Sequence, residues 1–315
     1  MSQAPLDAYD YLIVGAGPAG CLLANRLSAD PGVSVLLVEA GGRDNYPWIH
    51  IPVGYLYCIG NPRTDWCFST DAEAGLNGRT LGYPRGKVLG GCSAINGMIY
   101  MRGQAQDYDH WRQLGNRGWA WDDVLPYFIK SEDFERGPGP FHGVGGPLKV
   151  SDLRLRREIA ERFIEAAVAI GIPRNDDYNG AVQEGVDYFQ QTAYKGFRWS
   201  TAKGFLRPAR KRANLEVAVR AQATKVLFEG RRAVGVEYQR NGSIHRALAR
   251  EAVILSAGAI GSPQILQCSG VGDGELLRSL GIPLVHHLPG VGEDLQDHLQ
   301  IRLVYKTKLR TLNDE

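Results

Sequence analysis

A short βαβ pattern near the N-terminus constrains this chain more than any other feature. Residues 9–14 form an apolar run that leads into a glycine-rich turn at 15–20, and residues 18–29 then carry apolar side chains at helical spacing. A second apolar run at 33–38 ends at Glu39, 19 positions after the last glycine of the turn. Strand, glycine turn, helix, strand and acid together form a unit that binds dinucleotides. We therefore predict an α/β chain with a doubly wound parallel sheet.

The glycines of this turn and the helix that follows are together suited to binding a pyrophosphate. Gly15 permits the tight turn, Gly17 lets a pyrophosphate approach the backbone, and Gly20 lets helix and strand pack closely. The first turn of the helix adds free N–H groups and partial positive charge. Glu39 is expected to accept hydrogen bonds from the hydroxyls of an adenosine ribose. The predicted cofactor-binding residues of this unit are Gly15, Ala16, Gly17, Pro18, Ala19, Gly20, Glu39 and Ala40.

A second glycine-rich segment, at 84–98, carries few charges and many small residues. Such a segment lets backbone press against a large flat ligand without interference from side chains. A planar isoalloxazine ring needs a close, largely uncharged wall, which Gly90 and Gly91 followed by Cys92, Ser93 and Ala94 would provide. The two segments together predict a bound dinucleotide and hence redox chemistry. FAD is favoured, although the βαβ unit by itself does not distinguish FAD from NAD, and an NAD-dependent enzyme would leave the segment at 84–98 unexplained.

The composition bears on partners and location. The 315 residues include 36 Lys or Arg and 34 Asp or Glu, a net charge of only +2, whereas nucleic-acid binders usually carry a clear basic excess. We therefore expect no nucleic-acid partner. We also expect no transmembrane segment, because no apolar run approaches the ~20 residues that one needs. Five scattered cysteines without a CxxC pair suit reduced thiols. They favour the cytoplasm, with attachment to the periphery of the inner membrane left open.

The pattern of residues 41–171 predicts a lid-like loop followed by helices. Residues 41–83 are irregular and rich in aromatics, Pro and Gly, which is typical of a lid-like loop, and residues 103–135 look helical. A further helix is predicted to start at Ser151 or Asp152, either of which could cap it, and to stop at Gly171. Its apolar face is predicted to contain Ile159, Phe163, Ala167 and Ile170.

Short β-strands are predicted for most of the remainder. The stretch at 214–255 contains five short runs with turns at Gly230 and at Asn241-Gly242, the pattern of a β-meander. The runs are 215–220, 224–229, 233–239, 243–249 and 252–257. A helix is predicted to begin at Ser262, as its cap, with Pro263 at the first helical position. The last apolar run, 301–309, predicts one more strand.

Four segments of the chain resemble the glucose–methanol–choline oxidoreductases, which are FAD enzymes that oxidise alcohols. They come in the family's order and are YDYLIVGAGPAGCLLANRLS at 9–28, PRGKVLGGCSAINGMIYMRG at 84–103, GAIGSPQILQCSGVG at 258–272 and PGVGEDLQDH at 289–298. The likeness is greatest to choline-dehydrogenase-like and alcohol dehydrogenase members. It implies that a primary alcohol or a choline-like small molecule is oxidised to an aldehyde by hydride transfer to flavin N5. The electron acceptor stays open between a quinone, a carrier and oxygen.

The resemblance also implies further cofactor-binding residues. Val88 and the run 96–99 would line the flavin, and the backbone of Ala223 would meet the adenine. Arg85 and Gly91 would shape the site, and Asp297 and His298 would lie near the cofactor. The residues added in this way are Arg85, Val88, Gly91, Ser93, Asn96, Gly97, Met98, Ile99, Ala223, Asp297 and His298. Some relatives carry a histidine joined covalently to the flavin where this chain has Ile95, so we expect non-covalent FAD.

The family's proton acceptor is a histidine near the C-terminus of a considerably longer chain. None of the seven histidines here matches that position, and their spacing suggests no metal site. We therefore expect no catalytic residue in this chain, a catalytic His beyond residue 315, and an N-terminal fragment that is inactive alone. The alternative is a catalytically inactive flavin-binding remnant or an interaction protein.

These expectations define two interleaved domains. A Rossmann-like FAD-binding domain, with a doubly wound parallel sheet and a β-meander, is predicted to comprise 1–150 and 214–300. An incomplete α+β substrate domain is predicted to comprise 151–213 and the start of a truncated segment at 301–315.

Overall fold

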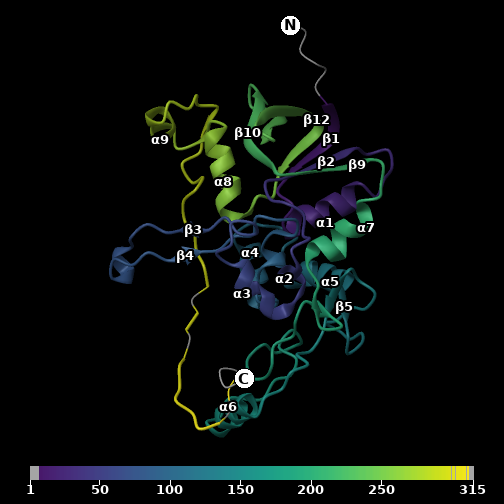
Figure 1. The fold of residues 1–315 in the computed structure, drawn as a ribbon, viewed down its shortest axis with the longest axis vertical. Coiled ribbons are helices and arrows are strands. Elements are labelled where there is room, and N and C mark those ends of the chain that lie inside the picture. The colour runs from purple at the N-terminus through teal and green to yellow at the C-terminus, as the bar shows by residue number, and fades with distance from the viewer. Residues whose placement is uncertain (1–6, 299, 302, 310, 312–315) are drawn as a thin grey trace. The chain divides into compact units, whose positions relative to one another are not determined.

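The structure, a computed structural model, describes residues 7–298, 300–301, 303–309 and 311 (Figure 1). The chain divides into two compact units. The first unit comprises Met1–Gly97 and Ser200–Gln296, and the second comprises Met98–Trp199 and Asp297–Glu315. The two units are thus interleaved in sequence and change over after Gly97, Trp199 and Gln296, whereas the domains predicted from the sequence change over after residues 150, 213 and 300.

Local contacts explain the shift of these boundaries. The segment before residue 150 joins the second unit because its strand β5 (Glu132–Phe134) pairs with β6 (Leu148–Val150), and because Gln191 forms bridges to both Ile99 and Ser151. The segment after residue 200 joins the first unit because a π-helical stretch, Ala202–Leu206, packs against the first helix. The short helix α7 (Arg207–Ala209) follows this stretch.

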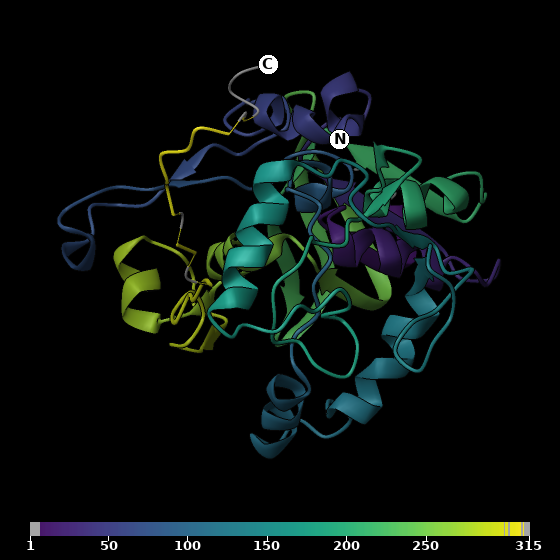
Figure 2. The same ribbon diagram turned by 90° about the horizontal axis from the view of Figure 1, so that it is seen from below.

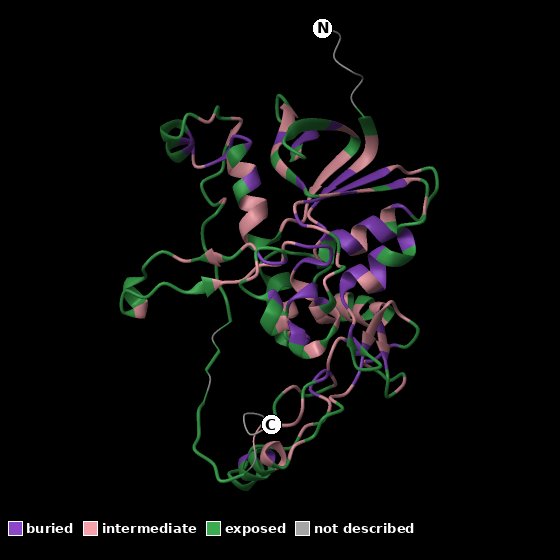
Figure 3. Cartoon of the chain, in the orientation of Figure 1, coloured by how far each residue is buried: buried purple, intermediate pink, exposed green. Residues whose placement is uncertain are grey.

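A six-stranded sheet with the order β10-β11-β12-β1-β2-β9 forms the centre of the first unit. Strand β1 (Asp7–Val14) lies parallel to β2 (Val35–Glu39), and β2 lies parallel to β9 (Leu215–Val219). All five residues of β2 are buried, as expected of a central strand of a parallel sheet (Figure 3). Helix α1 (Pro18–Leu27) connects β1 to β2, which confirms the predicted βαβ unit.

The antiparallel part of this sheet differs from the predicted meander in two ways. β10 (Ala221–Glu229), β11 (Arg232–Arg240) and β12 (Ser243–Leu255) form the meander, and the predicted runs 243–249 and 252–257 are one strand. β12 pairs antiparallel with β11 and parallel with β1, so it joins the two parts of the sheet. The first predicted run, β9, lies at the opposite edge of the sheet from β10. The predicted turns are confirmed, since Gly230, Asn241 and Gly242 all have positive φ angles.

Three further parts of the first unit lie outside this sheet. The predicted loop 41–83 contains the short helices α2 (Pro47–His50) and α3 (Tyr55–Cys58), 3₁₀ turns at Pro52–Gly54 and Ala74–Leu76, and the hairpin strands β3 (Phe68–Ser69) and β4 (Gly82–Tyr83), which run side by side in Figures 1 and 2. A 3₁₀ turn at Gly91–Ala94 follows. After the sheet come α8 (Gly258–Cys268), β13 (Val271–Gly272), α9 (Gly274–Ser279) and β14 (His286–His287).

Helix α8 begins at Gly258, so the predicted start at Ser262-Pro263 is wrong. Pro263 lies inside the helix, and the Ser262 hydroxyl accepts a hydrogen bond from the Ala257 N–H at 3.0 Å. Strand β12 ends at Leu255, so the helix begins only two residues after the strand and five residues before Pro263, the first helical position that the cap pattern predicted.

The second unit contains helices α4 (Ala105–Gln113), α5 (Trp121–Ser131) and α6 (Glu158–Ala169), together with β5, β6, β7 (Ala193–Tyr194) and β8 (Phe197–Arg198). The predicted capping of α6 by Ser151 or Asp152 is wrong. Ser151 instead forms a bridge to Gln191, and the Asp152 carboxylate pairs with Arg136 at 2.8 Å. The predicted apolar face of α6 is wrong in part, because Ile164 and Ala167 are buried whereas Phe163 and Ile170 are exposed.

The predicted strand at 301–309 is absent from the described residues of that run, 301 and 303–309, which form no strand. A strand needs a hydrogen-bonding neighbour, and no described strand pairs with them. Among the described residues, no helix combines the length and the apolar character that crossing a bilayer requires.

Candidate functional site

The two glycine-rich segments, far apart in sequence, meet in the first unit. The Gly90 N–H donates a hydrogen bond to the Ala16 carbonyl at 2.8 Å. A Cβ atom added to Gly91 would lie only 2.7 Å from the Cα atom of Gly17, and Gly91 has a φ of +51°. A side chain at Gly91 would therefore separate the two segments. We call the surface formed by residues 15–20 and 88–93 the cradle.

Glycine at the first and last positions of the 15–20 turn is required by packing. Gly15 has a φ of +96°, and a Cβ there would lie 2.5 Å from the Ser256 carbonyl oxygen. A Cβ on Gly20 would lie 1.9 Å from the Gly15 carbonyl oxygen. The predicted roles of these two glycines, tight turning and close packing of helix on strand, fit this geometry.

Gly17 differs, because no described residue fills the space that a Cβ atom would occupy there. Its φ is −73°, which any residue can adopt, and the nearest atom to an added Cβ would be the Ser256 oxygen at 3.9 Å. It is the N-cap of α1, and no side chain caps that end of the helix. The first N–H groups of a helix have no partner within the helix, so they are available to an anion. The open space and the uncapped helix end together fit a cofactor phosphate.

Glu39 lies at the end of β2 with its carboxylate turned toward the cradle. One oxygen accepts a hydrogen bond from the Ala16 N–H at 2.8 Å, and the other accepts one from the Gly41 N–H at 2.7 Å. Burial raises the pKa of Glu39 to about 7, although these N–H groups and nearby Lys87 oppose the shift. Each carboxylate oxygen can accept a second hydrogen bond, so the group can still receive ribose hydroxyls.

Several other predicted residues of the first unit adjoin the cradle or its support. The Ser93 hydroxyl donates to the Gly90 carbonyl at 2.6 Å and lies 2.8 Å from the Thr201 hydroxyl. Val88 is buried against Ile95 and forms a backbone bridge to Gly42. Arg85 places its guanidinium 4.2 Å from the centre of the Tyr83 ring.

The remaining predicted residues are divided between the two units. Ala223 lies in β10 opposite Tyr238, at a register shift, and packs against the core of the first unit. Asn96 and Gly97 close the first segment of that unit, whereas Met98 and Ile99 open the second unit, to which Asp297 and His298 also belong. His298 is exposed, and its N–H donates to the Asp297 carboxylate at 2.9 Å. The cofactor roles of these residues stay predictions.

Sequence reasoning missed Ser256, which fixes the first glycine turn. Its hydroxyl donates to the carbonyls of both Val14 and Gly15, at 2.9 and 2.8 Å. A signal was present, because residues 252–261 repeat the order of strand, small residues and helix seen at 9–20. Gly41 was also missed. An added Cβ there would lie 2.0 Å from the Lys87 carbonyl oxygen, so this glycine lets the loop after β2 pack against the segment that leads to the cradle.

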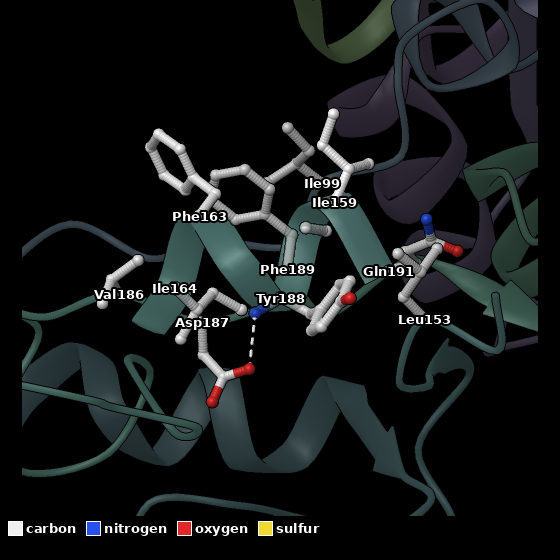
Figure 4. A pocket seen from close by; sticks show the side chains of 11 residues that line it. Ile99, Leu153, Ile159, Phe163, Ile164, Val186, Asp187, Tyr188, Phe189 and Gln191 are labelled. Carbon is white, nitrogen blue, oxygen red and sulfur yellow. Dashed lines mark hydrogen bonds between the residues drawn. The ribbon is translucent and has the colours of Figure 1, made fainter. Parts of the chain in front are cut away.

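The second unit contains an apolar pocket of about 390 Å³ (Figure 4). Ile159 and Phe163 of α6 line it together with Ile99 and Phe189. Its one carboxylate, Asp187, pairs with Arg174 at 2.8 Å. The pocket therefore offers apolar contact but no free proton acceptor.

Among the histidines, His142 has the most pronounced polar surroundings. It is buried, and its ring nitrogens lie 3.1 Å from Glu132 and 3.0 Å from Asp177. Burial lowers the pKa of His142, but the two carboxylates outweigh this effect and leave its pKa above the ordinary value. In the described part of the chain, no three His, Cys, Asp or Glu side chains are grouped so that they could hold a metal ion.

Comparison with known proteins gives consistent matches over nearly the whole chain. The family model described as GMC oxidoreductase matches residues 9–300. Human mitochondrial choline dehydrogenase is 47% identical over 94% of this chain and 51% of its own length. The alcohol dehydrogenase [acceptor] of Pseudomonas putida is 46% identical over 96% of this chain and 55% of its own. This chain thus spans about half the length of the curated relatives that it matches.

Solved structures agree with this assignment. Pyridoxine 4-oxidase from Mesorbium loti superposes with a TM-score of 0.86 and 34% identity, covering 89% of this chain and 55% of that one. An FAD-dependent oxidoreductase from Chaetomium thermophilum superposes with a TM-score of 0.85 and 35% identity, covering 92% and 52%. Both are well above the similarity that fold alone would explain, and the expected resemblance is confirmed: this chain belongs to the GMC oxidoreductase family.

Proposed function

We propose that this chain binds FAD non-covalently and forms the cofactor-holding part of an oxidoreductase that acts on the CH–OH group of a small alcohol. The observation that carries the proposal is the cradle, where the backbone of Gly91 meets that of Gly17 and the space beside Gly17 stays open. Membership of the GMC family and relatives named choline and alcohol dehydrogenases support it. A primary alcohol or a choline-like molecule is the proposed substrate, and an aldehyde is the product.

The residues of this chain would hold the cofactor at several points. The backbone at Gly17 and the first N–H groups of α1 would bind the pyrophosphate, and Glu39 would accept hydrogen bonds from the ribose. Gly90, Gly91 and Ser93 would lie against the flavin ring. The contributions that the resemblance implies for Asn96, Gly97, Met98, Ile99, Ala223, Asp297 and His298 stay part of the proposal.

The bound flavin would supply a hydride acceptor at N5. The part played by this chain is to bind and orient it, because residues 15–20 and 88–93 of the cradle include no Asp, Glu or His that could accept the proton. His142 lies between two carboxylates, and His50 has its ring bonded to the Asp44 carbonyl at 2.8 Å, so neither is offered as the base. We propose that a histidine outside these 315 residues takes the hydroxyl proton, as the resemblance implies.

Anaerobic reduction of the bound flavin tests this division of roles. The purified 315-residue chain should hold a yellow cofactor with a flavin spectrum, yet primary alcohols and choline should bleach it slowly or not at all. Fast bleaching would overturn the assignment of the base to sequence outside the chain. A chain that stays colourless after saturation with FAD would overturn the cofactor proposal itself.

Acid precipitation tests the non-covalent attachment. Ile95 is buried beside Val88 and Ile49 and offers no atom that could bond to the flavin. All the yellow colour should therefore pass into the supernatant. Colour retained in the pellet would contradict the proposal.

A further inference from the structure

The ring of His142 lies between two carboxylates of the second unit. Its Nδ1 atom is 3.1 Å from the Glu132 carboxylate, and its Nε2 atom is 3.0 and 3.2 Å from the two oxygens of the Asp177 carboxylate. An ionised carboxylate only accepts hydrogen bonds, and a neutral imidazole has one N–H and one lone pair. A neutral ring could therefore donate to one carboxylate but would turn its lone pair toward the other. Only the protonated ring, with an N–H on each nitrogen, satisfies both contacts.

Packing holds the ring in this position. The backbone of His142 exchanges two hydrogen bonds with that of Gly139, at 3.1 and 3.3 Å. The ring stacks on Phe134, with 4.1 Å between the ring centres, and the side chain is only 7% exposed. We therefore expect the loss of a proton to change the two carboxylate contacts rather than the position of the ring.

The two carboxylates differ in what else can bind them. Glu132 is fully buried, pairs with Arg102 at 3.0 Å and accepts a hydrogen bond from the Gly143 N–H at 2.9 Å. The Asp177 side chain is 37% exposed, so water can replace the histidine there. A buried carboxylate that loses a hydrogen bond has no water to replace it, which costs free energy. The single N–H of a neutral ring should therefore stay on Nδ1, facing Glu132, and the contact with Asp177 should break.

The other charged groups nearby are engaged elsewhere. Arg102 contacts the oxygen of Glu132 that His142 does not contact. Arg136 pairs with two other carboxylates, at 2.8 and 3.3 Å, which belong to Asp152 and Asp176. Within the described ranges, Glu132 and Asp177 are the ionisable groups that contact the ring, and the ring is the one cation that contacts Asp177. A neutral ring would leave the Asp177 carboxylate without a cationic partner.

Asp177 stands at the start of an irregular stretch that forms part of a pocket. Residues 178–184 line this pocket of about 320 Å³, together with Arg102 and Trp121 among others. Beyond Asn179, the five residues of the stretch are half-buried or exposed. The position of this wall therefore depends on the contacts at its ends, of which the one between Asp177 and His142 is charged.

We propose that His142 is a proton-dependent latch for this wall: the protonated ring holds Asp177, and loss of the proton releases Asp177 and loosens residues 178–184. Although burial lowers the pKa of His142, the two carboxylates outweigh it and keep this pKa above the ordinary value, so the release should occur above pH ~6.5. The latch lies within the second unit. It goes beyond the proposed function and does not depend on it.

Hydrogen exchange of the purified chain, followed by mass spectrometry at pH ~5.5 and pH ~9, tests the latch on either side of the range in which His142 should titrate. Protection factors, which correct for the intrinsic pH dependence of exchange, are compared for residues 178–184 and for helix α6 as an internal reference. Protection of 178–184 should fall about 10- to 100-fold more than that of α6 at the higher pH, as expected for the loss of one hydrogen bond between charged groups.

Asp177→Asn is the decisive variant, because an amide can both accept and donate hydrogen bonds. It can accept from the protonated ring and donate to the lone pair of the neutral ring, so residues 178–184 should stay protected at both pH values. His142→Gln removes the titrating group and should abolish the pH dependence. The matched control is His110→Gln, which alters an exposed histidine of α4 in the same unit and should leave the pH dependence unchanged.

Three results would overturn the proposal: equal protection of 178–184 at both pH values in the unaltered chain, a fall in Asp177→Asn as large as in the unaltered chain, or an equal fall in α6. Circular dichroism establishes that each variant is folded. If His142→Gln does not fold, Asp177→Asn decides alone, because it changes a partly exposed side chain. The exchange is measured without reference to the flavin, so failure of the flavin proposal would leave this test intact.

Discussion

Two glycines of one turn should respond in opposite ways to the same substitution, alanine. At Gly17 the added Cβ has no neighbour nearer than 3.9 Å, whereas at Gly20 it would lie 1.9 Å from the Gly15 carbonyl oxygen. Gly17→Ala should therefore leave the fold intact and weaken cofactor binding, while Gly20→Ala should destabilise the fold.

The expected magnitudes follow from these distances. Alanine in a compatible backbone conformation stabilises by about 0.4–1 kcal/mol through the unfolded state. Alanine is also a poorer N-cap than glycine, which costs a similar amount, so Gly17→Ala should change the apoprotein's free energy of unfolding by less than about 1 kcal/mol. If the new methyl group removes one hydrogen bond to a charged phosphate, worth about 1.5–3 kcal/mol, FAD affinity should fall about 10- to 100-fold. Gly20→Ala overpacks the turn and should cost about 1–3 kcal/mol or more.

Urea unfolding of the apoprotein and titration of flavin fluorescence measure the two effects separately. The proposed role of Gly17 would be refuted by a Gly17→Ala protein that binds FAD as tightly as the unaltered chain. It would equally be refuted if the substitution destabilised the apoprotein as much as Gly20→Ala does, because the effect would then be one of folding.

Three further predictions concern buried ionisable groups. Burial raises the pKa of Glu39 to about 7 from an unfolded value near 4.5, so the free energy of unfolding should fall as pH rises through this interval. In a pH series of urea titrations, Glu39→Gln should lack this part of the slope. His142 has a raised pKa, so its contribution to stability is complete below pH ~6.5 and should be lost as pH rises above that value; an unchanged slope in His142→Gln would contradict this. Glu132→Gln should lower the free energy of unfolding by about 3–5 kcal/mol, because the buried Arg102 guanidinium, 3.0 Å from the Glu132 carboxylate, would lose its ion-pair partner. A loss below about 1 kcal/mol in chemical unfolding would count against the ion pair.

The sequence predicted the βαβ unit well because its signals are local. Buried parallel strands are continuous apolar runs, and the glycine turn between them has its own pattern. The position of β9 could not be predicted in this way. Its run lies directly before that of β10, yet the two strands occupy opposite edges of the sheet, since the chain changes direction at Arg220 with a positive φ. Periodicity shows that a segment is a strand but not which strand it pairs with.

Helix starts failed for a related reason. Ser151, Asp152 and Ser262 are good caps by type, but each is engaged elsewhere. The backbone of Ser151 forms a bridge to Gln191, the Asp152 carboxylate pairs with Arg136, and the Ser262 hydroxyl accepts from the Ala257 N–H. A residue held in another arrangement in this way does not cap a helix. In the same way, the carboxylate of Glu39 was correctly placed near the glycine turn, but its bonds to Ala16 and Gly41 depend on how two loops meet.

The cradle is held together by contacts within the chain itself, and this has a consequence for binding. Its two segments are joined by the backbone hydrogen bond from Gly90 to Ala16 and by the close approach of Gly91 to Gly17, where a Cβ atom would collide. The Leu89 N–H also fixes the second segment to the Gly42 carbonyl of the loop after β2. Such contacts need no cofactor to order them, so FAD binding should lose little affinity to conformational entropy. The stabilisation by FAD should then follow the mass-action relation alone, about 2.7 kcal/mol at a hundredfold excess over the dissociation constant. Calorimetry of FAD binding tests this, because a large unfavourable binding entropy would show that the cradle must first be ordered by the cofactor.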